Sequence, residues 1–346
     1  MRGRGAASNP PNRFERLWLE RDADWTPEED PAPKTLFYRD QSQSIITYND
    51  SPDVPFRASV NPYRGCEHGC SYCFARITHE YLGFSAGLDF ETRIMVKENA
   101  PELLRQALAS PKWKPQKLAM SGVTDCYQPV ERRLQLTRRC LAVLAEFRNP
   151  VSIVTKNSLV TRDLDLLREL AAHQAAMVLL SINSLDPKLA GKLEPRAAMP
   201  KQRLAAVEAL AGAGVPTGVM VAPIIPALND HELPAILAAA KTAGASWAGM
   251  EIVRLPLTVA PIFDQWLERH VPERKDKILG RIRSMRGGKL NDPRFGSRMR
   301  GEGILADQIH QMFHVARRKV GLRDDGPELS TSSFRRLAGP QLALGL

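Results

Sequence analysis

The chain has 346 residues, of which 43% are hydrophobic, and carries a formal net charge of +10. This length permits one large barrel domain with extensions or two ordinary domains. It contains no run of about 18 apolar residues, and Met1–Arg13 lacks the apolar core of a secretory signal, so the sequence predicts a cytoplasmic protein with no membrane partner.

Short apolar runs alternate with helical patterns after a proline-interrupted leader, residues 1–50. Several of the runs are apolar on both faces, as in a parallel sheet covered by helices. Strands are expected at Arg57–Asn61, Lys117–Ser121, Val151–Thr155, Ala176–Ile182, Pro216–Ala222 and Ala248–Arg254. Helices are expected at Pro129–Phe147, Thr161–His173, Pro200–Ala213 and Asp230–Ala243, with Thr161 and Asp230 as N-caps and Gly214 and Gly244 as stops.

Six strand–helix units in series predict an α/β fold, a partial (β/α)6 barrel. The alternative is a doubly wound open sheet, which is disfavoured because no G-x-G-x-x-G follows the first strand. Beyond Pro256 the alternation ends, and three helices are expected at Phe263–His270, Lys275–Arg286 and Ile304–Val320. The predicted division is a poorly ordered leader (1–50), a barrel core (51–262), a basic helical extension (263–323) and a flexible tail (324–346).

Three of the five cysteines, Cys66, Cys70 and Cys73, lie within eight residues with the spacing C-x3-C-x2-C. A structural zinc site or a simple ferredoxin cluster requires four ligands. Three thiolates on a four-iron cluster would leave one iron open to a cofactor or substrate. The alternatives are a zinc site with His68 as fourth ligand and a redox cluster that recruits Cys126 or Cys140.

The motif, with Tyr72 before its third cysteine, resembles the signature of the radical S-adenosylmethionine (SAM) superfamily. The resemblance implies a 4Fe-4S cluster on Cys66, Cys70 and Cys73 whose open iron is chelated by SAM. It also implies reductive cleavage of SAM to a 5′-deoxyadenosyl radical that abstracts hydrogen from a substrate. Such an enzyme needs an electron donor, a flavodoxin or a ferredoxin.

The ends of the other strands supply the residues expected to bind SAM. A Gly-Gly-Glu-like motif is absent after the second strand. The pair Thr124-Asp125 there instead resembles the Ser/Thr-Asp of the spore photoproduct lyase and DNA-repair-photolyase-like branch. The longer stretches Asn61–Arg76 and Ser121–Glu131 resemble a bacterial group of uncharacterised radical SAM proteins related to that branch. The resemblance also implies that Lys156 pairs with the SAM carboxylate. The complete expected cofactor set is Tyr72, Ser121, Thr124, Asp125, Lys156, Ser181, Asn183, Glu194 and Arg196.

Cys126 follows Asp125 at the expected active face and is the candidate catalytic hydrogen donor. The lyase places its cysteine just before the Ser/Thr-Asp pair, where this chain has Gly122 and Val123. Photoproduct lyase activity is therefore not implied. Cys140, inside a helical pattern, is expected to be a small buried residue.

Most of the net positive charge lies between Gln265 and Arg323. This distribution predicts a DNA or RNA partner, and the alternative is a solvated helical face. The terminal Gln341–Leu346 resembles the peptide with which bacterial repair proteins bind the sliding clamp, and the alternative is an incidental apolar tail. Three functions stay open: a radical SAM enzyme acting on nucleic acid, one modifying a protein or small metabolite, and a non-catalytic iron–sulfur protein.

Overall fold

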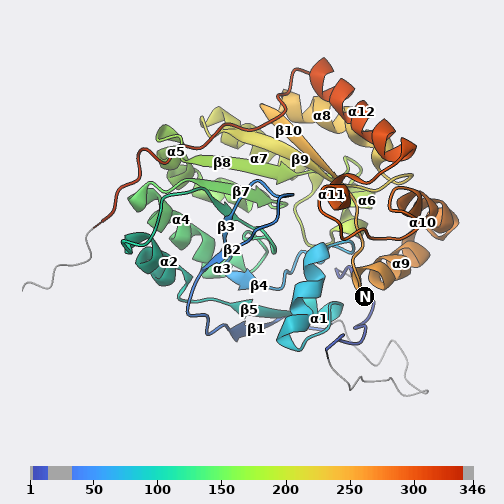
Figure 1. Ribbon diagram of the computed structural model, residues 1–346, viewed down its shortest axis with the longest axis horizontal. Helices are drawn as coiled ribbons and strands as arrows, with labels where there is room; N and C mark the ends of the chain where they lie inside the picture. Colours follow the sequence, from blue (N-terminus) through green and yellow to red (C-terminus); the bar gives the residue numbers. More distant parts are fainter. Residues whose placement is uncertain (1–2, 15–32, 338–346) are drawn as a thin grey trace, which may run out of the picture.

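The computed structural model describes residues 3–14 and 33–337 (Figure 1). Its main sheet has seven strands in the order β10-β9-β8-β7-β6-β3-β2, and every neighbouring pair is parallel except β2 and β3. The sheet does not close, because β10 and β2 form its two edges. The strands are β2 (Ile46–Tyr48), β3 (Ala58–Val60), β6 (Leu118–Met120), β7 (Val151–Thr155), β8 (Ala176–Ser181), β9 (Thr217–Ile224) and β10 (Trp247–Ile252). The predicted partial barrel and its six parallel strands are confirmed.

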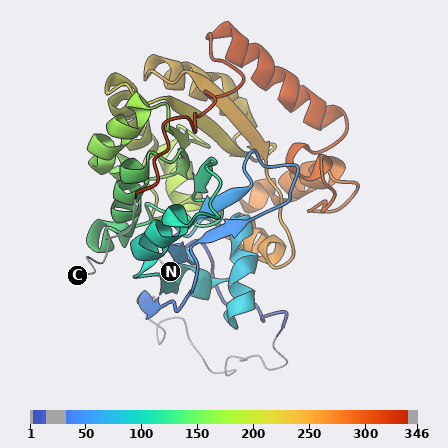
Figure 2. The ribbon, with the colours of Figure 1, turned by 60° about the vertical axis from the view of Figure 1, so that its left-hand side comes forward.

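Helices cover the outer face of this sheet, as two views of the ribbon show (Figures 1 and 2). The α-helices are α1 (Leu88–Thr92), α2 (Ala100–Ala109), α3 (Glu131–Leu134), α4 (Leu136–Phe147), α5 (Leu164–Ala172), α6 (Pro187–Leu193), α7 (Pro200–Gly212), α8 (Leu233–Thr242), α9 (Val259–His270), α10 (Lys275–Ser284), α11 (Ser297–Arg300) and α12 (Ile304–Lys319). Short 3-10 helices are η1 (Phe74–Leu82), η2 (Ser158–Asp163), η3 (Asp230–Glu232) and η4 (Pro272–Arg274). No described helix is long and apolar enough to cross a membrane.

Local backbone geometry corrects three helix predictions. The helix expected over Pro129–Phe147 is broken at Gln135, whose φ of 52° separates α3 from α4. Thr161 and Asp230 are not N-caps, because both lie inside short 3-10 helices, and Asn157 instead accepts the capping bond from Leu159 N. Gly214 and Gly244 adopt the left-handed conformation, as expected of residues that end helices.

The first 50 residues contribute more structure than a poorly ordered leader would. In residues 33–50, β1 (Leu36–Arg39) pairs with β5 (Arg93–Val96), which also pairs with β4 (Tyr63–Arg64) in a second sheet. Residues 3–14 pack beside α1, and Ala6 is fully buried. These segments reach the core only through partners distant in the chain, which no local pattern reveals.

The C-terminal segment from 324 to 337 runs across the outside of the barrel (Figure 2). Its backbone donates from Ser330 N to the carbonyl of Gln174, and from Arg335 N to that of Phe147. Phe334 packs against the core with its ring centroid 6.3 Å from that of Phe147. The flexible tail predicted from 324 is therefore docked as far as 337. The clamp-like peptide Gln341–Leu346 lies outside the described residues.

Candidate functional site

The cysteine loop joins β4 to η1 beyond the C-terminal end of β3, at the edge where a βα-barrel builds its active site. Cys66 and Cys70 are buried and Cys73 is partly exposed. Gly69, with φ of 68°, must be glycine, because a Cβ there would lie 2.7 Å from a Glu91 carboxylate oxygen. Burial raises the pKa values of the Cys70 and Cys73 thiols, and metal binding would favour their deprotonated forms.

A buried ion pair between Arg76 and Glu91 supports the cysteine loop. The Arg76 guanidinium lies 2.6 Å from the Glu91 carboxylate, with both side chains fully buried. Arg76 Nε also donates to the Cys70 carbonyl at 2.9 Å. Glu91 accepts two further bonds, from the backbone amides of Gly5 and Ala6. The N-terminal segment thus helps to fix Glu91, which in turn holds Arg76 against the cysteine loop.

Glu67 ties the loop to two other parts of the barrel. One of its oxygens accepts from Val130 N at 2.7 Å, and the other lies 3.0 Å from the Arg196 guanidinium. Gln128 adds two bonds, accepting from Glu67 N and donating to the Gly65 carbonyl. Arg196, expected at the cofactor, therefore holds the cysteine loop through Glu67.

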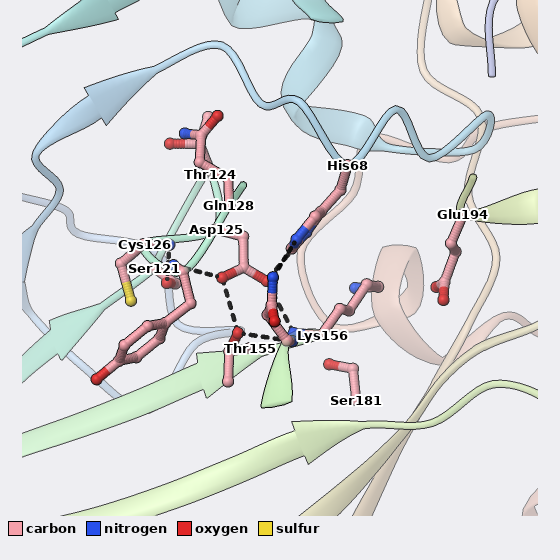
Figure 3. Close-up of polar contacts among 12 residues, drawn as sticks. His68, Ser121, Thr124, Asp125, Cys126, Gln128, Thr155, Lys156, Ser181 and Glu194 are labelled. Carbon is pink, nitrogen blue, oxygen red and sulfur yellow. Dashed lines mark hydrogen bonds and ion pairs between the residues drawn. The ribbon is translucent and has the colours of Figure 1, made fainter. Parts of the chain in front are cut away.

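Asp125 links the second strand end to the loop and to the third strand (Figure 3). Its carboxylate accepts from Thr155 Oγ1 and Lys156 N, each at 2.8 Å, and lies 3.3 Å from His68 Nδ1. Burial would raise the pKa of Asp125, but the His68 imidazolium and the amide donors lower it to about 2. Burial would lower the pKa of His68, but Asp125 and Cys66 raise it to about 10. The two side chains therefore form a charged pair at neutral pH.

Glu194 is held in a buried cluster with the tyrosine of the cysteine loop. It accepts from the Tyr72 hydroxyl and from the Arg203 guanidinium, whose Nη1 donates to the Ser181 carbonyl at 2.8 Å. The loop is fixed to the same region by the bond from Ser71 N to the Leu193 carbonyl. Tyr72 and Glu194 thus contact each other, and their bond fixes the ring that precedes Cys73.

Two expected cofactor residues keep polar groups that have no partner among the described residues. The amide oxygen of Asn183 is buried without a hydrogen-bond partner, while its nitrogen lies 3.5 Å from the Tyr72 hydroxyl. The Lys156 ammonium makes no hydrogen bond or ion pair in the described part of the chain, and Figure 3 shows it directed between Glu194 and Ser181. Burial would lower the pKa of Lys156, but Cys70 and Glu194 outweigh this and raise it. These groups suit a zwitterionic ligand with hydroxyl groups.

The remaining second-strand residues have structural partners. Ser121 Oγ accepts from Cys126 N at 2.8 Å, and Thr124 Oγ1 donates to the Tyr63 carbonyl at 2.9 Å. Cys126 is fully buried in the hydrophobic core with Cys140, and its thiol lies on the side of Asp125 away from His68 (Figure 3). This placement does not favour the catalytic role expected for Cys126.

Sequence reasoning missed two charged residues at the end of the last strand. Glu251 lies on β10, and Arg254 follows it with its guanidinium carbon 4.5 Å from the centre of the Phe74 ring. The sequence does contain a signal for a functional residue here, because the charged Glu251 interrupts an apolar strand between Met250 and Ile252.

The three thiols of the cysteine loop could each bind a separate iron of a cluster. In residues 3–14 and 33–337, no group of three or more His, Cys, Asp or Glu is arranged to hold one metal ion. A four-iron cluster places each ligand on a separate iron and so requires more widely spaced thiols. Cys126 and Cys140, packed in the core, are not placed to serve as a fourth ligand.

The family model described as Radical SAM superfamily matches residues 60–240. The chain belongs to the radical SAM superfamily. Uncharacterized proteins of Mycobacterium bovis and Mycobacterium tuberculosis are 40% identical to it over 222 residues, 64% of this chain and 65% of theirs. One of Methanocaldococcus jannaschii is 32% identical over 173 residues, 50% of this chain and 62% of its own. The matched region thus spans less than two thirds of these relatives.

Solved structures similar to this chain include spore photoproduct lyase. Its complex with a dinucleoside spore photoproduct has a TM-score of 0.59 and 18% identity, covering 83% of this chain and 80% of the lyase. A cysteine variant of the lyase has a TM-score of 0.57 and 19% identity, covering 82% and 77%. At these identities the likeness establishes the partial-barrel fold.

Proposed function

We propose that this radical SAM enzyme holds a 4Fe-4S cluster through Cys66, Cys70 and Cys73 and acts on a nucleic acid, in a reaction related to DNA repair. The observation that carries the proposal is the position of the three cysteines. They share one loop at the carboxyl edge of the parallel strands. The Lys156 ammonium and the Asn183 oxygen, which have no hydrogen-bond partner among the described residues, lie at the same edge. When held by Cys66, Cys70 and Cys73, a 4Fe-4S cluster would supply the electron for reductive cleavage of SAM, the chemistry that allows hydrogen abstraction from a substrate.

The protein's own residues divide between binding and positioning. Lys156 is assigned to the SAM carboxylate, because a compact ammonium pairs well with it. Asn183 and Ser181 are assigned to hydroxyl groups of the ribose. Asp125 acts through His68, and Glu194 acts through Tyr72, to hold the cysteine loop in place.

Support for a nucleic acid comes from the C-terminal region and from the ligand of the lyase. Exposed basic side chains there include Arg283, Lys289 and Arg300, whose side chains make no ion pair with the described residues and can contact phosphates. Spore photoproduct lyase has been solved with a dinucleoside photoproduct. A protein or metabolite substrate is the second candidate, favoured by the internal hydrogen bonds of Arg286 and Arg298.

The testing experiment is anaerobic reconstitution followed by mixing with SAM, a reductant and deuterated DNA or RNA. Deuterium transfer into 5′-deoxyadenosine is expected only with the correct substrate class. SAM cleavage without transfer from any nucleic acid would leave the radical SAM chemistry in place and remove the nucleic-acid proposal. In the cell the reductant would be a flavodoxin or a ferredoxin.

A clamp interaction through Gln341–Leu346 is proposed as a separate docking function. Deleting these six residues should abolish binding to a bacterial sliding clamp and leave SAM cleavage unchanged, because a tail peptide docks independently of the barrel. We also propose that residues 51–262 form the catalytic core and 263–323 its basic extension.

A further inference from the structure

The last parallel strand directs a carboxylate into the barrel interior. On β10, Ala248, Met250 and Ile252 belong to or pack against the core under the outer helices. Side chains alternate along a strand, so Gly249 and Glu251 face the opposite side from Ala248 and Met250. The pairing with β9 shifts register between Met250 and Ile252, but the influence of Lys156 on the pKa of Glu251 indicates that its carboxylate lies toward the interior. Gly249 adds no side chain on that face, so Glu251 is the polar group that β10 presents there.

Glu251 differs from the other carboxylates near the cysteine loop. Asp125, Glu67 and Glu194 each accept bonds from partners within the chain. Glu251 makes no hydrogen bond or ion pair with the described residues. Burial raises the pKa of Glu251, against the opposing influence of Arg254 and Lys156. A partly buried carboxylate without such partners is stabilised by a ligand that supplies N–H donors.

Arg254 provides a cation close to this carboxylate, three residues further along the chain. Its guanidinium lies over the ring of Phe74, which is 37% exposed and directly follows Cys73. Two neighbouring arginines are already engaged: Arg286 donates to the Val253 carbonyl at 2.7 Å, and Arg298 bonds to Asp53. Arg254 itself makes no hydrogen bond or ion pair within the described ranges, so it can receive an anion beside the cysteine loop.

We infer that Glu251 and Arg254 together select a guanine nucleotide, with Glu251 accepting the two adjacent N–H donors of the base and Arg254 contacting its phosphate. The inference rests on the proposed nucleic-acid substrate and specifies its base. A carboxylate matches the neighbouring N1–H and N2–H groups of guanine, and both bonds can form at once. Thymine presents a single N–H between two carbonyl oxygens, which repel a carboxylate. An unstacked base that enters the barrel is read on this edge.

The test measures fluorescence anisotropy of the reconstituted full-length protein with two labelled single strands at low salt. One strand is all thymidine, and the other carries one central guanosine. The guanosine strand is expected to bind about tenfold more tightly, as for a good bidentate base contact. Glu251→Gln should remove this preference without weakening the all-thymidine strand, because the amide presents N–H groups to the donors of guanine. Arg254→Met should weaken both strands by the same factor.

Glu273→Gln is the matched control, because Glu273 is exposed and the substitution removes the same charge; it should keep the preference. Equal affinity of the wild-type protein for the two strands, or a preference retained in Glu251→Gln, would overturn the inference and leave the nucleic-acid proposal standing. Failure of both strands to bind would remove that proposal as well. A loss of SAM affinity in Glu251→Gln would assign the carboxylate to the cofactor and also overturn the inference.

Discussion

The cysteine loop (Cys66–Cys73) and the basic region (Gln265–Arg323) are both rich in polar residues but use them differently. Around the loop, charges are buried in pairs such as Arg76–Glu91, which fix the backbone of the cysteines. In the basic region some arginines fix loops while others remain exposed. A local spacing of cysteines therefore predicts chemistry more safely than a local excess of charge, because the composition of a segment does not reveal the partners of its arginines.

The largest expected effect is on the metal centre. Alanine at Cys66, Cys70 or Cys73 should abolish the absorbance of the reconstituted 4Fe-4S cluster, because each cysteine is proposed to supply one of its three protein ligands. Cys126→Ala is the control, since Cys126 lies in the core. Complete loss of the cluster in that control would contradict a site built on three cysteines.

The second expected effect is on the free energy of unfolding, through the buried Arg76–Glu91 pair that supports the cysteine loop. Glu91→Ala leaves Arg76 buried without its counter-charge, so the free energy of unfolding should fall by roughly 3–5 kcal/mol. The exposed pair Arg105–Glu146 offers a comparison, and Glu146→Ala should cost less than about 1 kcal/mol. Urea unfolding followed by circular dichroism measures both. Equal decreases in the free energy of unfolding for Glu91→Ala and Glu146→Ala would mean that the buried pair stabilises the protein no more than the exposed pair does.

The third expected effect separates binding from positioning among the strand ends. Lys156→Ala should weaken SAM binding about tenfold or more, because a charge-assisted hydrogen bond contributes roughly 1.5–3 kcal/mol. Asp125→Asn should instead lower the yield of the cluster, since Asp125 contacts His68 in the cysteine loop. Isothermal titration with SAM and iron quantification distinguish the two. Unchanged SAM affinity in Lys156→Ala would remove this lysine from the cofactor site.

Most of the fold and part of the site could be predicted from the sequence, for physical reasons that differ. Strands such as Val151–Thr155 were predictable because both faces are buried and read as continuous apolar runs. The break at Gln135 was not, because the residue adopts a left-handed conformation that no local turn signal marks. The partners of Arg196 and Asp125 were also hidden, since Glu67 and His68 lie far from them along the chain.

The smallest expected effect concerns the salt dependence of nucleic-acid binding. The sequence alone would suggest neutralising Arg294, Arg298 and Arg300, but the structure pairs Arg294 with Asp292 and Arg298 with Asp53, which leaves only Arg300 of the three without an ion pair among the described residues. Replacing the exposed Arg283, Lys289 and Arg300 together with Gln should instead lower the slope of log K against log salt. The slope should fall by about 0.7 for each phosphate of a single strand that these side chains no longer neutralise.

The Arg298→Gln variant is the control for this measurement. It should lower the free energy of unfolding and leave the slope nearly unchanged, because its guanidinium is engaged by Asp53 and Ser51 within the protein. Anisotropy across a salt series measures the slope, and thermal unfolding measures the stability. A larger change of slope in Arg298→Gln than in the triple variant would mean that the internally bonded arginines, rather than the exposed ones, contact the phosphates. The assignment of phosphate contacts to the exposed side chains Arg283, Lys289 and Arg300 would then be wrong.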